Sequence, residues 1–206
     1  MGKKVQSIDQ SIDDIVGFLY EADSARELLR GMGQRIGVID LTDNVAAHSY
    51  VVTMCGWVVA KMEGLSDEEV GKVLQRGLLH DLNETRFGEH HWVQQQYIVA
   101  DEGRASDEQL AQLPFGEELR EEVRAYEKRE TVVDRVVKDG DLLATIMYVR
   151  KQAVKGNQEA KRWLDGRAMY NKLTTNSGKR LADEIYKQRP FAWQDKVLPK
   201  GSKSKE

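Results

Sequence analysis

Apolar residues recur at intervals of three and four along most of this chain, which is the spacing of one face of an α-helix. In the clearest segment, 45–62, a stripe that begins with His48 continues through Val51, Val52, Cys55, Val58, Val59 and Met62. Three more segments are predicted to be helical: 13–30, 116–129 and 131–155. Signals for β-hairpins are weak, because the Asp139-Gly140 pair lies inside a helical pattern. The pattern predicts an all-α fold.

Residue pairs that are typical of helix starts indicate two further helices. Ser66, with Glu69 three residues later, is a capping box and predicts a helix that runs to about Asp81. Ser106 with Gln109 is a weaker pair of the same kind. These signals extend the helical prediction over the middle of the chain, where the apolar spacing is less regular.

The length and composition indicate one globular domain of ordinary size. A chain of 206 residues with 40% hydrophobic residues can bury a substantial core. No internal repeat is visible in the sequence. We expect a single helical bundle over 25–175, with an N-terminal helical extension over 1–24 and a C-terminal helix and flexible tail over 176–206.

The charge and cysteine content exclude several classes of protein. The chain carries 31 Lys and Arg against 34 Asp and Glu, so broad electrostatic binding to nucleic acid or to anionic membranes is not expected. Cys55 is the single cysteine, which excludes an internal disulfide framework and a multi-cysteine zinc site. No stretch approaches the roughly 18 apolar residues of a membrane span, and the first residues, Met-Gly-Lys-Lys-Val, are not followed by the apolar segment that is typical of a signal peptide. We expect a cytoplasmic protein.

Four polar residues lie on stripes that are otherwise apolar, and they are the candidate metal ligands: His48, His80, Asp81 and Asp141. Burying an ionised carboxylate without a partner is costly, so each must find a cation or a hydrogen bond. One at a time, the histidines could be satisfied core residues and the aspartates solvated. Together they could bind one divalent metal, and mixed nitrogen and oxygen ligands suit Mn, Fe, Co, Ni or Zn better than Ca or Mg.

The order of these residues resembles the His…His-Asp…Asp signature of the HD-domain metal-dependent phosphohydrolases, an all-helical superfamily. Within it, the 5′-deoxynucleotidase branch is the most similar, over roughly residues 25–155. Three motifs carry that resemblance: Asn44-Val45-Ala46-Ala47-His48; His80-Asp81-Leu82-Asn83-Glu84 followed by Gly88-Glu89; and Val137-Lys138-Asp139-Gly140-Asp141-Leu142-Leu143. The resemblance implies a single HD-domain helical bundle that binds one divalent transition metal, with Mg as a further possibility.

The chain departs from that branch around the substrate. Ala47 replaces an acidic residue, and the segment 90–93, His-His-Trp-Val, replaces a Pro-containing stretch. The branch has an Arg-Trp pair near the sugar and phosphate, and the nearest match is Arg35-Ile36. The resemblance therefore implies a phosphate contact at Arg35. At the two departures, Ile36 could pack against the sugar without stacking on it, and Trp92 could either supply a stacking face for a base or be a core or interface residue. Since Ile36 offers no hydrogen bond to a 2′-hydroxyl, a modest preference for 2′-deoxynucleotides is predicted.

The resemblance also assigns catalytic roles. Glu84 lies four residues after His80, so on a continued helix it would project from the same face and could serve as a general acid or base. Glu89 matches the second acidic residue of the branch. His90 and His91 raise the alternative of a second metal ion, as found in two-metal members of the superfamily.

These features predict an enzyme that removes phosphate from deoxyribonucleoside 5′-monophosphates. The first alternative is a compact deoxynucleoside triphosphate triphosphohydrolase, since the altered residues around 36 and 90–93 could reshape the pocket. The second alternative is a non-catalytic HD module that binds a nucleotide. The resemblance implies a deoxynucleotide as the partner and a homo-oligomer, a dimer or larger, as the assembly.

Overall fold

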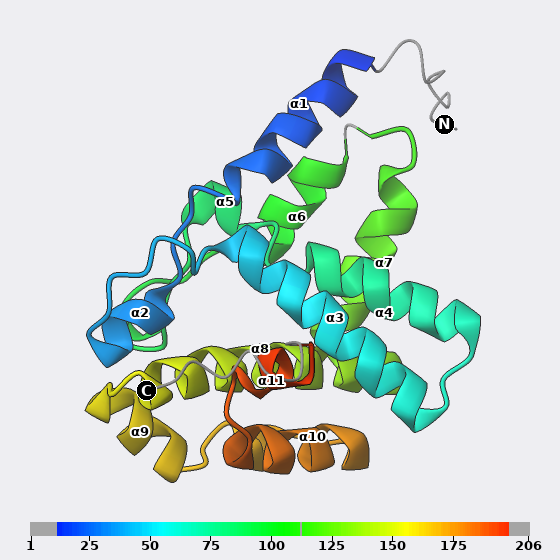
Figure 1. Cartoon of the computed structure of the whole chain (residues 1–206). Coiled ribbons are helices and arrows are strands. Elements are labelled where there is room, and N and C mark those ends of the chain that lie inside the picture. The colour runs from blue at the N-terminus through cyan, green and yellow to red at the C-terminus, as the bar shows by residue number, and fades with distance from the viewer. Residues whose placement is uncertain (1–11, 112, 198–206) are drawn as a thin grey trace.

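The computed structural model in Figure 1 describes residues 12–111 and 113–197. Within these ranges every regular element is a helix, and the one β-bridge joins Leu29 to Asn44. The all-α prediction is confirmed. The parts of the expected N-terminal extension and C-terminal tail that cover 1–11 and 198–206 lie outside the described residues. None of the described helices is long and apolar enough to cross a membrane.

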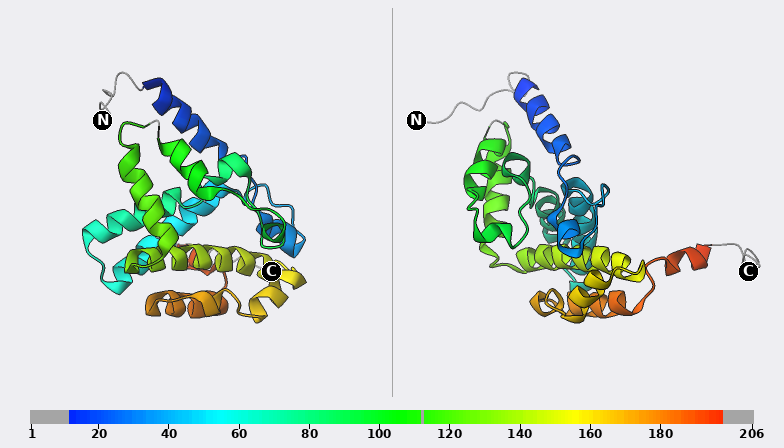
Figure 2. Two further views of the ribbon diagram at one scale, coloured as in Figure 1. Left: turned by 180° about the vertical axis from the view of Figure 1, so that it is seen from behind. Right: turned by 90° about the vertical axis from the view of Figure 1, so that its left-hand side faces the viewer.

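The helices follow one another along the chain with short connections. The first half contains α1 (Ile12–Ser24), α2 (Gly31–Ile36), α3 (Val45–Glu63), α4 (Asp67–Leu79), α5 (Glu84–Phe87), the 3₁₀ turn η2 (Gln94–Gln96) and α6 (Glu102–Leu110). The second half contains α7 (Gly116–Lys128), α8 (Val132–Val154), α9 (Gln158–Asp165), the 3₁₀ turn η3 (Tyr170–Lys172), α10 (Asn176–Lys187) and α11 (Ala192–Val197). In Figure 2, α10 lies along α8, and α11 extends away from the helical body.

Helix α8 is the centre of the bundle, because α3, α4, α7, α9 and α10 all pack against it. Glycines let the backbones approach closely at two crossings. A Cβ atom on Gly140 of α8 would lie 2.8 Å from the carbonyl oxygen of Val52 in α3, and one on Gly77 of α4 would lie 2.9 Å from Thr53 Oγ1 in α3. Glycine at these two positions therefore allows α3 to pack closely against both α4 and α8.

Side-chain caps and one buried ion-pair network fix the ends of these helices. The predicted capping box of Ser66 and Glu69 begins α4, and a second box, Thr131 with Asp134, begins α8. Asp134 is fully buried and also pairs with Arg76 of α4, whose Nε lies 2.8 Å from Glu122 of α7. The network ties the start of α8 to α4 and α7.

The structure differs from the sequence prediction at two helix ends. The predicted helix over 13–30 ends at Ser24, and the chain then pairs with a distant segment, since the carbonyl of Leu28 accepts a hydrogen bond from the amide of Val45. Helix α6 begins after Asp101, whose side chain accepts a hydrogen bond from a backbone amide, and Ser106 is buried inside that helix.

Candidate metal centre and active-site cleft

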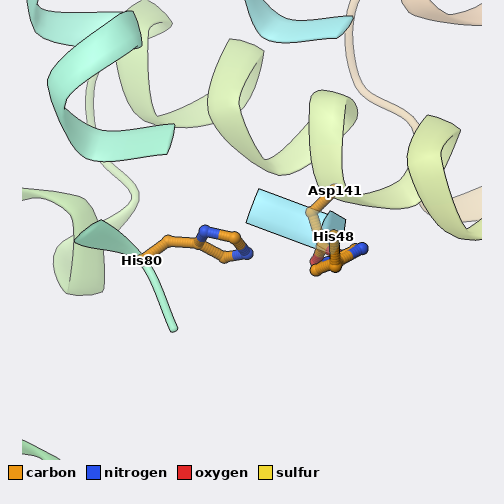
Figure 3. Close-up of side chains that lie close together, drawn as sticks. All are labelled: His48, His80 and Asp141. Carbon is orange, nitrogen blue, oxygen red and sulfur yellow. The ribbon is translucent and has the colours of Figure 1, made fainter. Parts of the chain in front are cut away.

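Three helices bring two imidazoles and a carboxylate to one point, as Figure 3 shows. His48 lies in the first turn of α3, His80 directly follows α4, and Asp141 lies in the middle of α8. One ligand atom from each lies within 4.8 Å of those from the other two. His48 Nε2 is 3.1 Å from Asp141 Oδ1. Residues separated by as much as 93 positions therefore form one candidate metal site.

Asp81 places a second carboxylate at the same point. Its Oδ2 lies 2.9 Å from His80 Nε2 and 3.8 Å from His48 Nε2. The histidine side chains are only 2% (His80) and 5% (His48) exposed, so this polar cluster is sheltered from water. The structure thus brings together all four residues that the sequence proposed as ligands.

The two ring nitrogens of His80 have different environments. Nδ1 lies 2.9 Å from the carbonyl oxygen of Gly77, so Nδ1 carries the hydrogen and donates it. In the neutral ring this leaves the lone pair on Nε2, a buried atom that faces Asp81 Oδ2 at 2.9 Å without a well-aligned hydrogen bond. A histidine whose other nitrogen is held by a carbonyl is the usual arrangement of a metal ligand. The donor set of two imidazoles and two carboxylates fits a divalent metal.

The ionisation of the cluster also suits a cation. Burial lowers the pKa of His48, so its imidazole is neutral, which is the form that binds a metal. Burial alone would raise the pKa of Asp141, but the positive charge of Lys138 and the hydrogen bond with His48 outweigh burial and hold that pKa well below its ordinary value. Lys138 Nζ is 2.5 Å from Asp141 Oδ2. The site therefore presents the ionised carboxylate of Asp141 beside the neutral imidazole of His48.

Glu84, at the start of α5, lies in the cleft beside this cluster. Its Oε2 is buried and without a hydrogen-bond partner among the described residues. Burial, together with the charges of Asp81 and Glu89, raises the pKa of Glu84 to about 10. Without a cation nearby, this carboxyl group keeps its proton at neutral pH, whereas a bound cation would favour the ionised form.

The cleft has a volume of about 270 Å³, and both acidic and basic side chains line it. Four cationic side chains line it: Arg30, Arg35, Lys138 and Lys172. Glu89 also lines it, and Glu89 Oε2 accepts a hydrogen bond of 2.6 Å from the amide of Gly31, which attaches the segment after α5 to the start of α2. A second recess of about 510 Å³ reaches the same centre, and the two share Asp81, Lys138 and Asp141.

Comparison with known proteins places this arrangement in a family. A profile of the HD domain matches residues 23–187. The chain belongs to the HD domain family. The match includes every residue of the cluster and of the cleft. No curated protein matches the sequence.

Solved structures of low sequence identity share the fold. A conserved hypothetical protein from Pyrococcus furiosus has a TM-score of 0.70 at 22% identity, over 84% of this chain and 99% of that chain. A protein from Pyrococcus horikoshii has a TM-score of 0.66 at 18% identity, over 83% and 98%. A predicted metal-dependent phosphohydrolase from Magnetospirillum magnetotacticum has a TM-score of 0.62 at 19% identity, over 94% and 95%.

The substrate contacts expected from the sequence divide into two groups in this HD domain. Arg35 and Trp92 line the cleft, and the Arg35 guanidinium lies 5.4 Å from the centre of the Trp92 ring. Ile36, in contrast, is 2% exposed and belongs to the hydrophobic core, where its carbonyl accepts a hydrogen bond from Asn157. The α2 helix turns Ile36 inward as it turns Arg35 toward the cleft, so Ile36 is a core residue instead of a sugar contact.

Two of the four cationic cleft residues have no signal in the sequence. Arg30 precedes α2, and its Nη1 is buried without a partner among the described residues. Lys172 comes from the turn after α9. Neither belongs to a motif or to an apolar stripe, because the fold alone brings these distant segments to the cleft.

The alternative of a second ion at His90 and His91 gains no geometric support. The His90 ring stacks on Phe87, and His91 Nδ1 accepts a hydrogen bond from the amide of Val93. In the described part of the chain, the cluster suited to a metal contains neither histidine.

Proposed function

We propose that this HD domain is a metal-dependent phosphohydrolase that removes phosphate from deoxyribonucleoside 5′-monophosphates. The observation that carries the proposal is the buried Nε2 of His80, which faces Asp81 Oδ2 at 2.9 Å among three potential ligands, beside a cleft lined with cations. Opposite charges within one small cleft suit a substrate that carries an anionic group to a metal ion. The fold it shares with a predicted metal-dependent phosphohydrolase is consistent with this chemistry.

His48, His80, Asp81 and Asp141 would hold the metal. When bound, a divalent ion supplies a water of lowered pKa and offsets charge on the phosphoryl group. Arg30, Arg35 and Lys172 provide cationic contacts for the remaining phosphate oxygens. Lys138 holds Asp141 by an ion pair, which keeps that carboxylate in place beside His48.

Glu84 is the group that moves protons. Hydrolysis forms a bond between a water oxygen and phosphorus and breaks the bond between phosphorus and the 5′-oxygen. The water must lose a proton and the leaving 5′-oxygen must gain one. A carboxyl group in the cleft, with one oxygen free of other partners, can accept the first proton or donate the second.

The deoxynucleotide part of the proposal depends on the three motifs around His48, His80 and Asp141. With Ile36 in the core, the sugar preference depends on that resemblance alone. The four cations of the cleft are more than one phosphate requires, which keeps the triphosphohydrolase as the second candidate. A homo-oligomer and the identity of the metal stay predictions.

The experiment is a substrate panel with Mn²⁺ or Co²⁺ as the metal. Purified protein is incubated with dAMP, AMP, dATP and ATP, and the released phosphate, pyrophosphate and triphosphate are measured separately. We expect phosphate release from dAMP. Triphosphate release from dATP would establish the second candidate, and binding without release of any product would indicate a non-catalytic nucleotide-binding module.

A further inference from the structure

A groove of about 530 Å³ adjoins the cleft, and Glu84 lines the cleft but not the groove. It lies between α2, the segment that follows α5, and α9, and it borders the cleft, since Arg35, His91 and Trp92 line both. Its outer wall is α9, which contributes Trp163. The groove and the cleft are therefore neighbouring recesses that meet at Arg35, His91 and Trp92.

The sizes of the two parts suggest how a nucleotide divides between them. Sites for small ligands usually enclose about 300–1,000 Å³. The cleft alone, at about 270 Å³, falls below that range, whereas the groove adds about 530 Å³. A phosphate and its sugar can occupy the cleft, but a base attached to that sugar must extend into the neighbouring space.

The groove offers the chemistry that a planar base needs. Trp92 is 55% exposed, and Trp163 is partly buried against the core. The Arg35 guanidinium lies 5.4 Å from the centre of the Trp92 ring and 5.6 Å from that of Trp163, which places both indoles around one cation at the junction with the cleft. Indole faces stack on any base, and a guanidinium next to them can contact phosphate or sugar.

We propose that the base of the nucleotide binds in this groove against the indoles of Trp92 and Trp163, while its phosphate lies in the cleft. The inference rests on the proposed function and adds the base subsite to it. Trp163, which no motif of the sequence singles out, is the specificity-determining residue from α9. Because stacking increases with ring area, purine nucleotides bind more tightly than pyrimidine nucleotides.

The test compares a nucleotide with its base-free counterpart, 2-deoxyribose 5-phosphate. For Trp163→Ala, we expect the KM for dAMP to rise roughly 5-fold to 100-fold, which is the usual contribution of stacking one base on an aromatic ring. The kinetic constants for 2-deoxyribose 5-phosphate should stay within about twofold of wild type, because that substrate does not reach the groove. Trp163→Phe, which keeps an aromatic face, should retain most of the affinity for dAMP.

Trp193→Ala is the matched control, since Trp193 is 61% exposed on α11 and belongs to neither the groove nor the cleft. Equal losses for dAMP and for the base-free ester in Trp163→Ala would overturn the inference, because they would show that Trp163 acts on the fold or on Arg35. An unchanged KM for dAMP would overturn it as well. Failure of the proposed function looks different, since wild-type protein would then hydrolyse neither substrate.

Discussion

His80 has the most specific environment of any single residue in the site. Its Nδ1 is held by the carbonyl of Gly77, and its Nε2 faces Asp81 and the other potential ligands, so removal of the ring takes away a preorganised metal ligand. We expect His80→Ala to lose bound Mn²⁺, with a metal content per protein chain near zero after gel filtration. His90→Ala, whose ring stacks on Phe87, should keep its metal. Full metal content in His80→Ala would refute the assigned site.

Glu84 is expected to matter for turnover more than for metal binding. Glu84→Gln keeps the size of the side chain but cannot take up or release a proton, so kcat should fall by about 10²–10⁴-fold, the usual share of general acid–base catalysis. Elemental analysis of the same sample should show unchanged metal. Glu68→Gln, on the exposed side of α4, is the control with wild-type kcat. A Glu84→Gln variant with wild-type kcat would leave Glu89 as the proton carrier.

Some site residues could be predicted from the sequence and others could not, and the difference has a physical reason. His48 and Asp141 are visible because a polar side chain on an apolar helix stripe needs a partner. Ile36 and Arg35 are neighbours in sequence, yet the helix turn sends one into the core and the other to the cleft. Trp163 reaches the groove only through the packing of α9 on α8, which no local pattern encodes.

At the scale of helices, the crossing of α3 and α8 sets the distance between His48 and Asp141. Gly140→Ala would put a methyl group 2.8 Å from Val52 O and 2.9 Å from the backbone nitrogen of Gly56, so the two helices must separate. We expect a loss of about 1–3 kcal/mol in the free energy of unfolding, as for other overpacked cores. Affinity for Mn²⁺ should fall too, because the ligands move apart.

Gly71→Ala provides the control for that variant. Gly71 is an exposed glycine in α4 with no atom within 4 Å of the added Cβ. The substitution should stabilise the protein by up to about 1 kcal/mol, since alanine favours the helix. Urea unfolding and a Mn²⁺ titration measure both quantities. A Gly140→Ala protein that is as stable as Gly71→Ala would show that the helices do not depend on the glycine contact.

The helices that position the metal site were also the easiest to predict. Strong apolar stripes and a capping box predicted α3, α4 and α8 within a few residues of their observed ends. The end of α1 was misplaced because the pairing of Leu28 with Val45 is a long-range contact, and the start of α6 was misplaced because Asp101, not Ser106, caps that helix. The spacing of apolar residues predicts which face of a helix is buried, but it does not predict which other segment packs against that face.

At the scale of the whole molecule, the site is a cluster of ionisable groups, and bringing them together out of water lowers the stability of the folded protein. Two carboxylates, two imidazoles and Glu84 come from separate helices and their ends to one sheltered point. A cation that binds only the folded protein offsets that loss, and at a concentration 100 times its dissociation constant it stabilises by about 2.7 kcal/mol. The stability of the protein therefore depends on both metal and pH.

The pH dependence of the metal-free protein follows from Glu84. Its pKa is 4.5 in the unfolded chain and is raised to about 10 in the folded protein by burial and by the charges of Asp81 and Glu89. The folded state keeps a proton that the unfolded chain releases, so the stabilisation is fully present below pH 4.5 and is lost as the pH rises toward 10. In EDTA, we expect the free energy of unfolding to fall by at least about 1 kcal/mol between about pH 5 and 9.

Glu84→Gln isolates this contribution, because glutamine does not titrate and other groups remain the same in both proteins. The difference in free energy of unfolding between Glu84→Gln and wild type should grow with pH in favour of the variant. Saturating Mn²⁺ should reverse the trend in the wild type, since a cation favours the ionised carboxylate and more of it is ionised at higher pH. Urea unfolding at three pH values, with and without metal, measures both effects. Parallel curves for wild type and Glu84→Gln in EDTA would show that the Glu84 carboxyl titrates normally.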